Sequence, residues 1–178
     1  MISVHGHRYL YRKIAYKSCD RDTRQTKAGL DFSICSRLCV KILFMKILVT
    51  GGSGFLGTHV RNFLDADDFS RRSGFDILNF QDVTRVSEYD VVIHLAALLD
   101  KNPASSGHVF LTNVEGTVNI LREMKEGAVF IFASTKDVYG RFADGFQEVP
   151  ESCQTLYAGQ SALEWSKLHL RMIRRTMK

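Results

Sequence analysis

Short apolar runs alternate with segments of helical periodicity from Met45 to the end of the chain. The runs 90–95 (DVVIHL) and 128–133 (AVFIFA) are typical of strands buried within a sheet. The predicted strands are 46–50, 68–70, 75–78, 90–95 and 128–133. The predicted helices are 55–64, 109–124 and 161–177. This alternation predicts an α/β fold in which helices cover a doubly wound, mostly parallel sheet.

The composition is that of an ordinary soluble globular protein. The 178 residues are 45% hydrophobic and 24% charged, and no apolar run approaches the ~18–20 residues that span a bilayer. Cys35 and Cys39 are four residues apart, but no His/Cys set at zinc spacing follows them, so we expect no metal site. Free thiols are typical of a reducing compartment, so we expect a cytoplasmic protein that binds no membrane.

Positive charge is concentrated in residues 1–44. This segment carries nine Lys/Arg and three Asp/Glu, a net of +6, whereas the whole chain carries +5. The rest of the chain therefore carries a net −1. The basic pI gives no reason to expect that the folded domain binds nucleic acid.

Residues 1–44 show no sustained strand or helix period. Met45 is followed at once by the first predicted strand, so our leading hypothesis is that Met45 is the initiator. Residues 1–44 would then be an upstream extension, disordered or not translated, and 45–178 the folded domain. A transit peptide is the alternative, since the segment is basic and contains serine, although it also contains three aspartates.

Three glycines lie between the first predicted strand and the first predicted helix: Gly51, Gly54 and Gly57. Gly51 permits a sharp turn, Gly54 lets the backbone approach a phosphate with no Cβ in the way, and Gly57 lets the helix pack close to the strand. The N-terminus of the helix offers free N–H groups and a partial positive charge. This strand–turn–helix pattern predicts a Rossmann-like fold with a dinucleotide-binding site.

Five stretches together carry a resemblance to a known family: TGGSGFLG (50–57), FDIL (75–78), IHLAA (93–97), NVEGTVNIL (113–121) and FASTKDVYG (132–140). Over about Met45–Arg175 the chain resembles the extended short-chain dehydrogenase/reductases, which are NAD(P)-dependent epimerases, dehydratases and reductases of nucleotide sugars. The resemblance implies an oxidoreductase or epimerase that transfers hydride between NAD(P) and a nucleotide sugar or a related carbonyl or alcohol.

The resemblance also implies a set of cofactor-binding residues. In the family an Asp-aliphatic pair such as Asp76–Ile77 holds the adenine, although Asp76 could also be a surface turn residue. Asn113 opens a helix and resembles an asparagine that bonds back to the sheet, the alternative being a helix cap. His94 is expected to be a packed core histidine. The implied set is Gly51, Ser53, Gly54, Phe55, Leu56, Gly57, Arg71, Arg72, Asp76, Ile77, Leu95, Ala96, Ala97, Asn113 and Ala133.

Arg71 and Arg72 follow the second predicted strand. NAD enzymes place an acidic residue there for the ribose 2′-hydroxyl, and NADP enzymes place arginines there for the 2′-phosphate. The pair therefore favours NADP over NAD, with a solvated pair of charges as the alternative.

The catalytic positions follow the family's pattern only in part. Thr135, with Ser134 as the alternative, lies four residues before the tyrosine of VYG, where the family has a residue that orients a substrate oxygen. Lys136 disfavours 4,6-dehydration. The family's base is a tyrosine with a lysine four residues later. Here Lys167 belongs to the Ser-Lys-Leu signature, but Leu163 stands four residues before it and Tyr157 ten before it. Tyr157 and Lys167 could converge only if Tyr157 lies in a loop; otherwise Tyr157 is a packed surface tyrosine.

The resemblance leaves the activity of this chain open. Family members run to roughly 300 residues, so we expect a sheet that is incomplete on its C-terminal side, with an unpaired edge. One hypothesis is an enzyme with Thr135, Tyr157 and Lys167 in catalytic roles. The other is a non-catalytic dinucleotide-binding module or a truncated remnant. A homodimer through the helices 109–124 and 161–177 is a further expectation.

Overall fold

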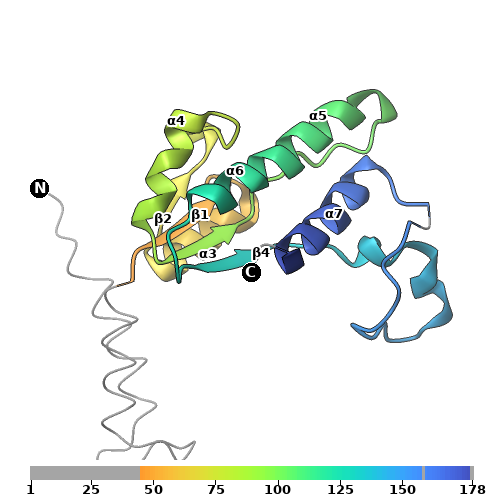
Figure 1. Ribbon diagram of the computed structural model, residues 1–178. Helices are drawn as coiled ribbons and strands as arrows, with labels where there is room; N and C mark the ends of the chain where they lie inside the picture. The colour runs from red at the N-terminus through yellow and green to blue at the C-terminus, as the bar shows by residue number, and fades with distance from the viewer. Residues whose placement is uncertain (1–44, 158, 177–178) are drawn as a thin grey trace, which may run out of the picture.

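A parallel sheet of four short strands forms the centre of the protein (Figure 1). The computed structural model describes residues 45–157 and 159–176, so the expectations for 1–44 lie outside the described residues. The strands are β1 Ile47–Thr50, β2 Asp67–Phe69, β3 Val91–His94 and β4 Val129–Phe132. Their order is β2-β1-β3-β4, and all neighbours are parallel. The winding reverses between β1 and β3, which confirms the doubly wound arrangement and creates a switch point there.

Helices lie on both faces of this sheet (Figure 1). They are α3 Phe55–Leu64, α4 Phe80–Val83, α5 Ser106–Phe110, α6 Gly116–Glu123 and α7 Ala162–Thr176. The π-helical turn η4, Leu111–Glu115, joins α5 to α6, so the predicted helix 109–124 is one continuous helical rod. Helix α3 packs on β1, and α7 packs beside α5. Short 3₁₀ segments are η1 Arg71–Ser73, η2 Thr84–Glu88, η3 Pro103–Ser105 and η5 Lys136–Gly145.

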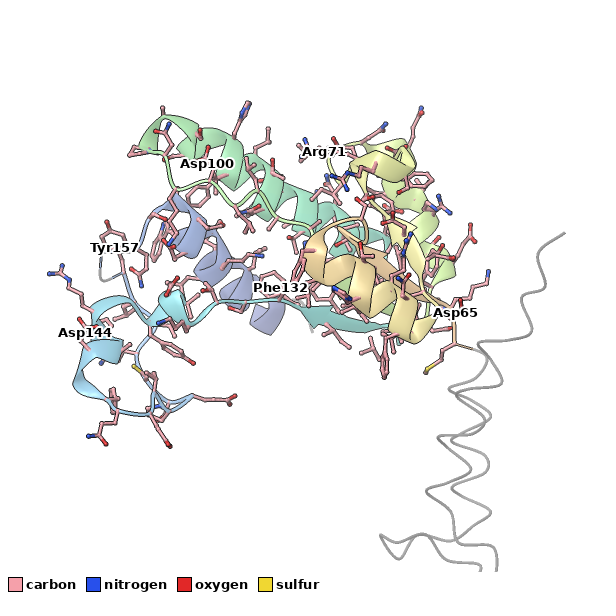
Figure 2. All side chains as sticks on the ribbon, turned by 180° about the vertical axis from the view of Figure 1, so that it is seen from behind. Asp65, Arg71, Asp100, Phe132, Asp144 and Tyr157 are labelled. Atoms are coloured by element: carbon pink, nitrogen blue, oxygen red, sulfur yellow. The ribbon has the colours of Figure 1, made fainter. Side chains whose placement is uncertain are left out.

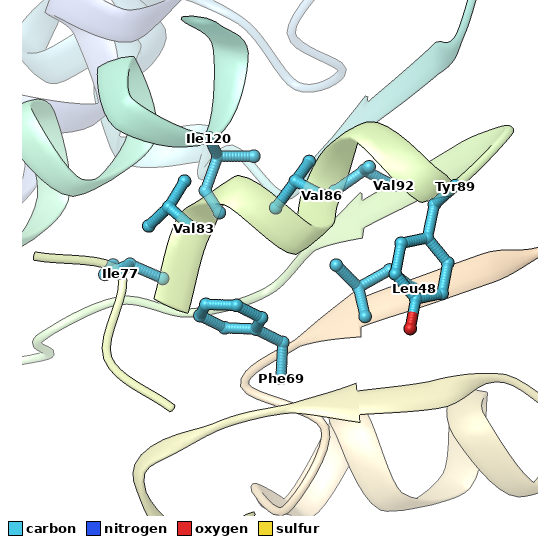
Figure 3. Packing of buried hydrophobic residues seen from close by; sticks show 8 residues of the cluster. All are labelled: Leu48, Phe69, Ile77, Val83, Val86, Tyr89, Val92 and Ile120. Carbon is cyan, nitrogen blue, oxygen red and sulfur yellow. The ribbon is translucent and has the colours of Figure 1, made fainter. Parts of the chain in front are cut away.

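The main hydrophobic core lies between the sheet and the layer formed by α4, η2 and α6 (Figure 3). Leu48, Phe69 and Val92 come from three neighbouring strands and are fully buried. The core cluster is Leu48, Phe69, Ile77, Val83, Val86, Tyr89, Val92 and Ile120. Each large side chain buried in this way contributes roughly 1.5–3 kcal/mol to folding. The core therefore holds the strand ends, and the loops that leave them, in fixed positions.

Strand β4 is only partly buried, which corrects the expectation for 128–133. Val129 and Ile131 are 48% and 49% exposed, whereas Phe130 and Phe132 stack near His94 on the core face. Alternate residues of a strand point to opposite faces. The outer face of β4 is open because α3, on that side, packs on β1, two strands away.

Residues 75–78 form a turn, so the strand predicted there is wrong. The Asp76 carboxylate accepts a hydrogen bond from the Leu78 N–H (2.9 Å), and the Asp76 N–H donates to the Asp82 carboxylate (2.9 Å). The Asn79 N–H closes the turn on the Asp76 carbonyl (3.0 Å). An aspartate that bonds its own backbone two residues on favours a turn over a strand. Ile77 still reaches the core and is 6% exposed.

His94 joins β3 to β1 and α6 through a buried chain of hydrogen bonds. The Thr117 hydroxyl donates to the Asn113 carbonyl (2.6 Å), so it accepts from His94 Nε2 (2.8 Å). His94 Nδ1 then accepts from the Thr50 hydroxyl (2.7 Å), whose oxygen accepts from the Ala96 N–H (3.2 Å). This assignment uses every polar atom of a neutral imidazole. Burial, and to a lesser degree the Lys167 charge, lowers the pKa of His94 to about 3.

We expect His94 to make the fold acid-sensitive. Because its folded-state pKa lies below its ordinary value of 6.5, the unfolded chain takes up the proton first, and stability falls as the pH drops from 6.5 toward 3. Between pH 7 and pH 5 this effect amounts to about 2 kcal/mol. Denaturant titrations of the full chain and of His94→Gln should therefore diverge by that amount. Two pH profiles that run parallel would contradict the neutral, buried assignment.

Candidate functional site

A cleft of about 1030 Å³ opens where the carboxyl ends of the strands meet. Parallel strands end at the same edge of a sheet, so the loops after β1, β2, β3 and β4 converge there, and α7 closes one side. The cleft brings together sixteen of the residues predicted from sequence: Gly51, Ser53, Gly54, Phe55, Leu56, Gly57, Arg71, Arg72, Asp76, Ile77, Leu95, Ala96, Ala97, Ala133, Thr135 and Lys167. Asn113 and Tyr157 do not line it.

The glycine turn after β1 is packed too tightly for side chains. Gly51 has a positive φ of 69° and donates its N–H to the Phe69 carbonyl (2.8 Å). A Cβ on Gly57 would lie 2.1 Å from the Gly51 carbonyl oxygen, and a Cβ on Gly51 would lie 2.9 Å from the Ala96 nitrogen. Helix α3 starts from Gly54, which supplies no capping side chain. The first-turn amides of α3 are therefore left for a ligand such as a phosphate.

Two arginines border the cleft next to this turn. Arg71 and Arg72 lie in η1, directly after β2, and both line the cleft. The Arg72 guanidinium donates to the Ser53 carbonyl (3.3 Å), which holds it over the glycine turn. The cleft thus offers two cations and a set of backbone donors at one end, a combination suited to an anionic group.

Asn113 is 1% exposed and supports the wall of the cleft from inside the protein. Its carboxamide accepts from the Leu98 N–H (2.7 Å) and donates to the Leu98 carbonyl (3.2 Å) and to the Ser166 hydroxyl (3.0 Å). It lies inside the continuous helical rod, in η4, so the expectation that it opens a helix is wrong. Because it ties the loop after β3 to α7, it positions two walls of the cleft.

Lys167 reaches the cleft from α7. The residue is 6% exposed, and its Nζ lies 4.7 Å from the centre of the Phe132 ring. Within the described residues no carboxylate oxygen lies within 4 Å of this nitrogen. Burial lowers the pKa of Lys167 to about 8. Thr135 lies across from α7 in the segment after β4, where its Oγ1 accepts from the Asp137 N–H (3.3 Å) and caps η5.

Tyr157 lies away from Lys167. It is 63% exposed and packs edge-to-face on Trp165, with ring centres 5.3 Å apart. Trp165 and Lys167 are two residues apart on α7, and such residues point to nearly opposite sides of a helix. Figure 2 shows Tyr157 in the segment that precedes α7, well apart from Phe132 at the end of β4. One turn before Lys167 the cleft is lined by Leu163 instead.

Sequence reasoning missed an ion pair at the mouth of the cleft. Glu164 is 5% exposed; burial opposes its ionisation, but hydrogen bonds from Lys101 (2.6 Å) and Ser161 outweigh this and lower the pKa of Glu164. Glu164 also accepts from the Ser161 N–H (2.8 Å), as in a capping box. The Ser-x-x-Glu spacing at 161–164 was the available signal for Glu164; for Lys101 we find none.

The parallel sheet and the glycine turn define a fold of the Rossmann type, and the comparisons with known proteins identify the family. Residues 47–175 match the NAD dependent epimerase/dehydratase family. The chain belongs to this family, which confirms the resemblance read from the sequence.

Individual relatives agree with this assignment. The chain is 31% identical over 147 residues to a UDP-N-acetyl-alpha-D-glucosaminuronate decarboxylase of Bacillus cytotoxicus, covering 68% of this chain and 45% of the relative. It is 34% identical over 131 residues to UDP-glucuronic acid decarboxylase 4 of Arabidopsis thaliana, covering 58% of this chain and 28% of the relative. The chain thus spans less than half the length of these relatives.

Solved structures show the same fold. A short-chain dehydrogenase/reductase superfamily protein of Agrobacterium tumefaciens with bound NAD matches with a TM-score of 0.64 and 26% identity, covering 74% of this chain and 44% of that one. RMD of Pseudomonas aeruginosa, complexed with NADPH, matches with a TM-score of 0.59 and 25% identity, covering 72% of this chain and 48% of that one.

Two negative findings concern only the described residues. No helix among 45–157 and 159–176 is long and apolar enough to cross a membrane. Within the same ranges, no group of three or more His, Cys, Asp or Glu side chains is placed to hold a metal ion.

Gly57→Ala should disrupt the turn, because the new Cβ would collide with the Gly51 carbonyl at 2.1 Å. We expect a loss of several kcal/mol in the free energy of unfolding, measured by denaturant titration. Gly107→Ala is the matched control, since this glycine lies in α5 with nothing within 4 Å of its added Cβ. It should be neutral or stabilise by up to about 1 kcal/mol. Equal effects of the two substitutions would refute the close approach of α3 to β1.

Proposed function

We propose that this chain binds a nicotinamide dinucleotide in the cleft, with its pyrophosphate at the glycine turn. The observation that carries the proposal is the turn itself, where a Cβ at Gly51 or Gly57 would collide with backbone. A backbone cradle free of side chains, at a helix N-terminus and beside two arginines, fits a pyrophosphate. The adenine end would lie by Asp76 and Ile77, and the nicotinamide end toward Thr135 and Lys167. When bound, the dinucleotide would supply a hydride acceptor or donor.

NADP is the proposed form of the dinucleotide. The two carboxylates of β2 are engaged elsewhere: Asp67 accepts from the Tyr89 hydroxyl (2.8 Å), and Asp68 lies 3.5 Å from the Arg61 guanidinium. Neither of them lines the cleft. The positions that follow β2 in the cleft are Arg71 and Arg72. A 2′-phosphate would meet two cations there, which supports NADP over NAD.

The proposed substrate is a nucleotide-linked sugar, by analogy with the names of the relatives. A second hollow of about 770 Å³ adjoins the cleft and shares Lys101, Asp137 and Glu164 with it. The substrate would approach the nicotinamide end from this side, with Thr135 orienting a hydroxyl or carbonyl oxygen. A cytoplasmic location and a homodimer remain part of this proposal.

A dinucleotide-binding module without hydride transfer is the second candidate. The specific observation in its favour is that Leu163 lines the cleft one turn before Lys167, while Tyr157 packs on Trp165 outside the cleft. An acid/base role for Tyr157 would require it to cross from one side of α7 to the other. Binding of the dinucleotide is common to both candidates, so it is the function to test first.

Arg71→Ala/Arg72→Ala should weaken NADP⁺ binding to the full chain at least tenfold, with a change of less than about threefold for NAD⁺. The reason is that only NADP⁺ carries the 2′-phosphate that the guanidinium groups would pair with. Calorimetric titration of the wild-type chain and the double variant with each dinucleotide measures this. Tighter binding of NAD⁺ than of NADP⁺ by the wild-type chain would overturn the choice of cofactor, and no binding of either by a folded sample would overturn the proposed function.

A further inference from the structure

Strand β4 lies at the edge of the sheet and carries none of the features that usually prevent an edge from pairing with another chain. It pairs with β3, and among the described residues no strand pairs with its other side (Figure 1). Proteins usually protect such an edge with charged side chains, proline or a bulge. The other edge strand, β2, carries Asp67 and Asp68, whereas residues 127–135 (GAVFIFAST) contain no charge and no proline. The edge of β4 is therefore open to pairing with another strand.

The hydrogen-bonding groups on this open edge come from Phe130 and Phe132. The N–H groups of Val129 and Ala133 donate to carbonyls on the side of β3, at 2.8 and 3.3 Å. Successive residues of a strand direct their N–H and C=O groups to alternate sides, so those of Phe130 and Phe132 point to the open edge. On the outer face of the sheet, Val129 and Ile131 are 48% and 49% exposed. An incoming strand would thus meet backbone donors and acceptors with an apolar surface beside them.

The segment around β4 is complementary to a second copy of itself. In an antiparallel pairing centred on Ile131, Phe130 lies opposite Phe132 of the second copy, and the two exchange both backbone hydrogen bonds. Glu126 and Lys136 lie five residues before and five residues after Ile131, so each would lie opposite the other's charge. Both are exposed, and neither forms an ion pair among the described residues. Opposite charges across two strands stabilise the pairing, and a two-fold axis makes this contact twice. A shift of the register by two residues would lose both ion pairs.

We propose that β4 pairs with β4 of a second copy of this chain, antiparallel and about a two-fold axis at Ile131. Two four-stranded sheets would then join into one continuous sheet. The two copies of Ile131 would meet on its outer face and cover each other. This surface differs from the helices 109–124 and 161–177, through which the sequence led us to expect a homodimer. The proposal goes beyond dinucleotide binding and does not depend on it.

Oxidative cross-linking of the full chain tests the pairing and its register. The two copies of Ile131 would form a non-hydrogen-bonded pair with Cα atoms about 4.5 Å apart, which is within the range of a disulfide. The two copies of Val129 would be roughly 13 Å apart, because each lies opposite Ala133 of the other copy. We expect Ile131→Cys to give at least tenfold more disulfide-linked dimer than Val129→Cys, which is equally exposed on the same face.

Peptide mass mapping assigns the bond, and the unsubstituted chain is the control for the native cysteines. Equal cross-linking of the two variants, or no cross-linking of Ile131→Cys, would overturn the proposal.

A charge placed on the axis tests whether association in solution needs this edge. Ile131→Lys would bring two ammonium groups opposite each other, where like charges repel. Leu156→Lys is the matched control, since Leu156 is an apolar residue that is 67% exposed and lies outside β4. In sedimentation equilibrium we expect a dimer for the unsubstituted chain and for Leu156→Lys. We expect at least tenfold weaker association for Ile131→Lys, with all three chains folded by circular dichroism.

A monomeric unsubstituted chain, or equal effects of the two substitutions on the dissociation constant, would contradict the proposed pairing. Because no dinucleotide is present, the result is independent of the NADP⁺ titration.

Discussion

The contact between Gly57 and the Gly51 carbonyl is the constraint on which the cleft depends. There is room at that point for a hydrogen but not for a carbon, since a Cβ would lie 2.1 Å from the oxygen. Helix α3 can therefore begin directly at the end of β1, and its first-turn amides face the switch point between β1 and β3. Gly51 makes a similar approach to Ala96 and fixes the loop after β3 against the same turn.

The opposite wall of the cleft depends on buried polar groups. The Asn113 side chain bonds both Leu98 and Ser166, so it holds the loop after β3 in a fixed position relative to α7. His94 makes the matching link from β3 to β1 and α6. Buried polar groups that are fully hydrogen-bonded rigidify a structure, and loss of one partner leaves the other unsatisfied. Lys167 is the exception. Its amine lies 4.7 Å from the centre of the Phe132 ring, and among the described residues no carboxylate oxygen lies within 4 Å of it.

The spacing of apolar residues and glycines along the chain was enough to predict the elements that depend on local sequence. The helix 55–64 has its predicted bounds, and the strands around 46–50 and 90–95 differ by one residue at their ends. The turn at 75–78 was misread because hydrogen bonds of Asp76 compete with strand pairing in a way that apolar periodicity does not reveal. The exposure of β4 depends on what packs against it, which spacing does not encode. From the sequence, Tyr157 could either converge with Lys167 from a loop or pack on the surface. Its edge-to-face contact with Trp165, which depends on the tertiary packing, favours the surface position.

The central claim is that a dinucleotide lies on the glycine turn. Hydrogen exchange of the full chain with and without saturating NADP⁺, read by peptide mass spectrometry, tests it most directly. We expect slower exchange in the peptides covering 51–57 and 95–98, which line the cleft, and unchanged exchange in η2, on the far side of the core. Binding that leaves 51–57 unprotected would place the dinucleotide elsewhere and contradict the account.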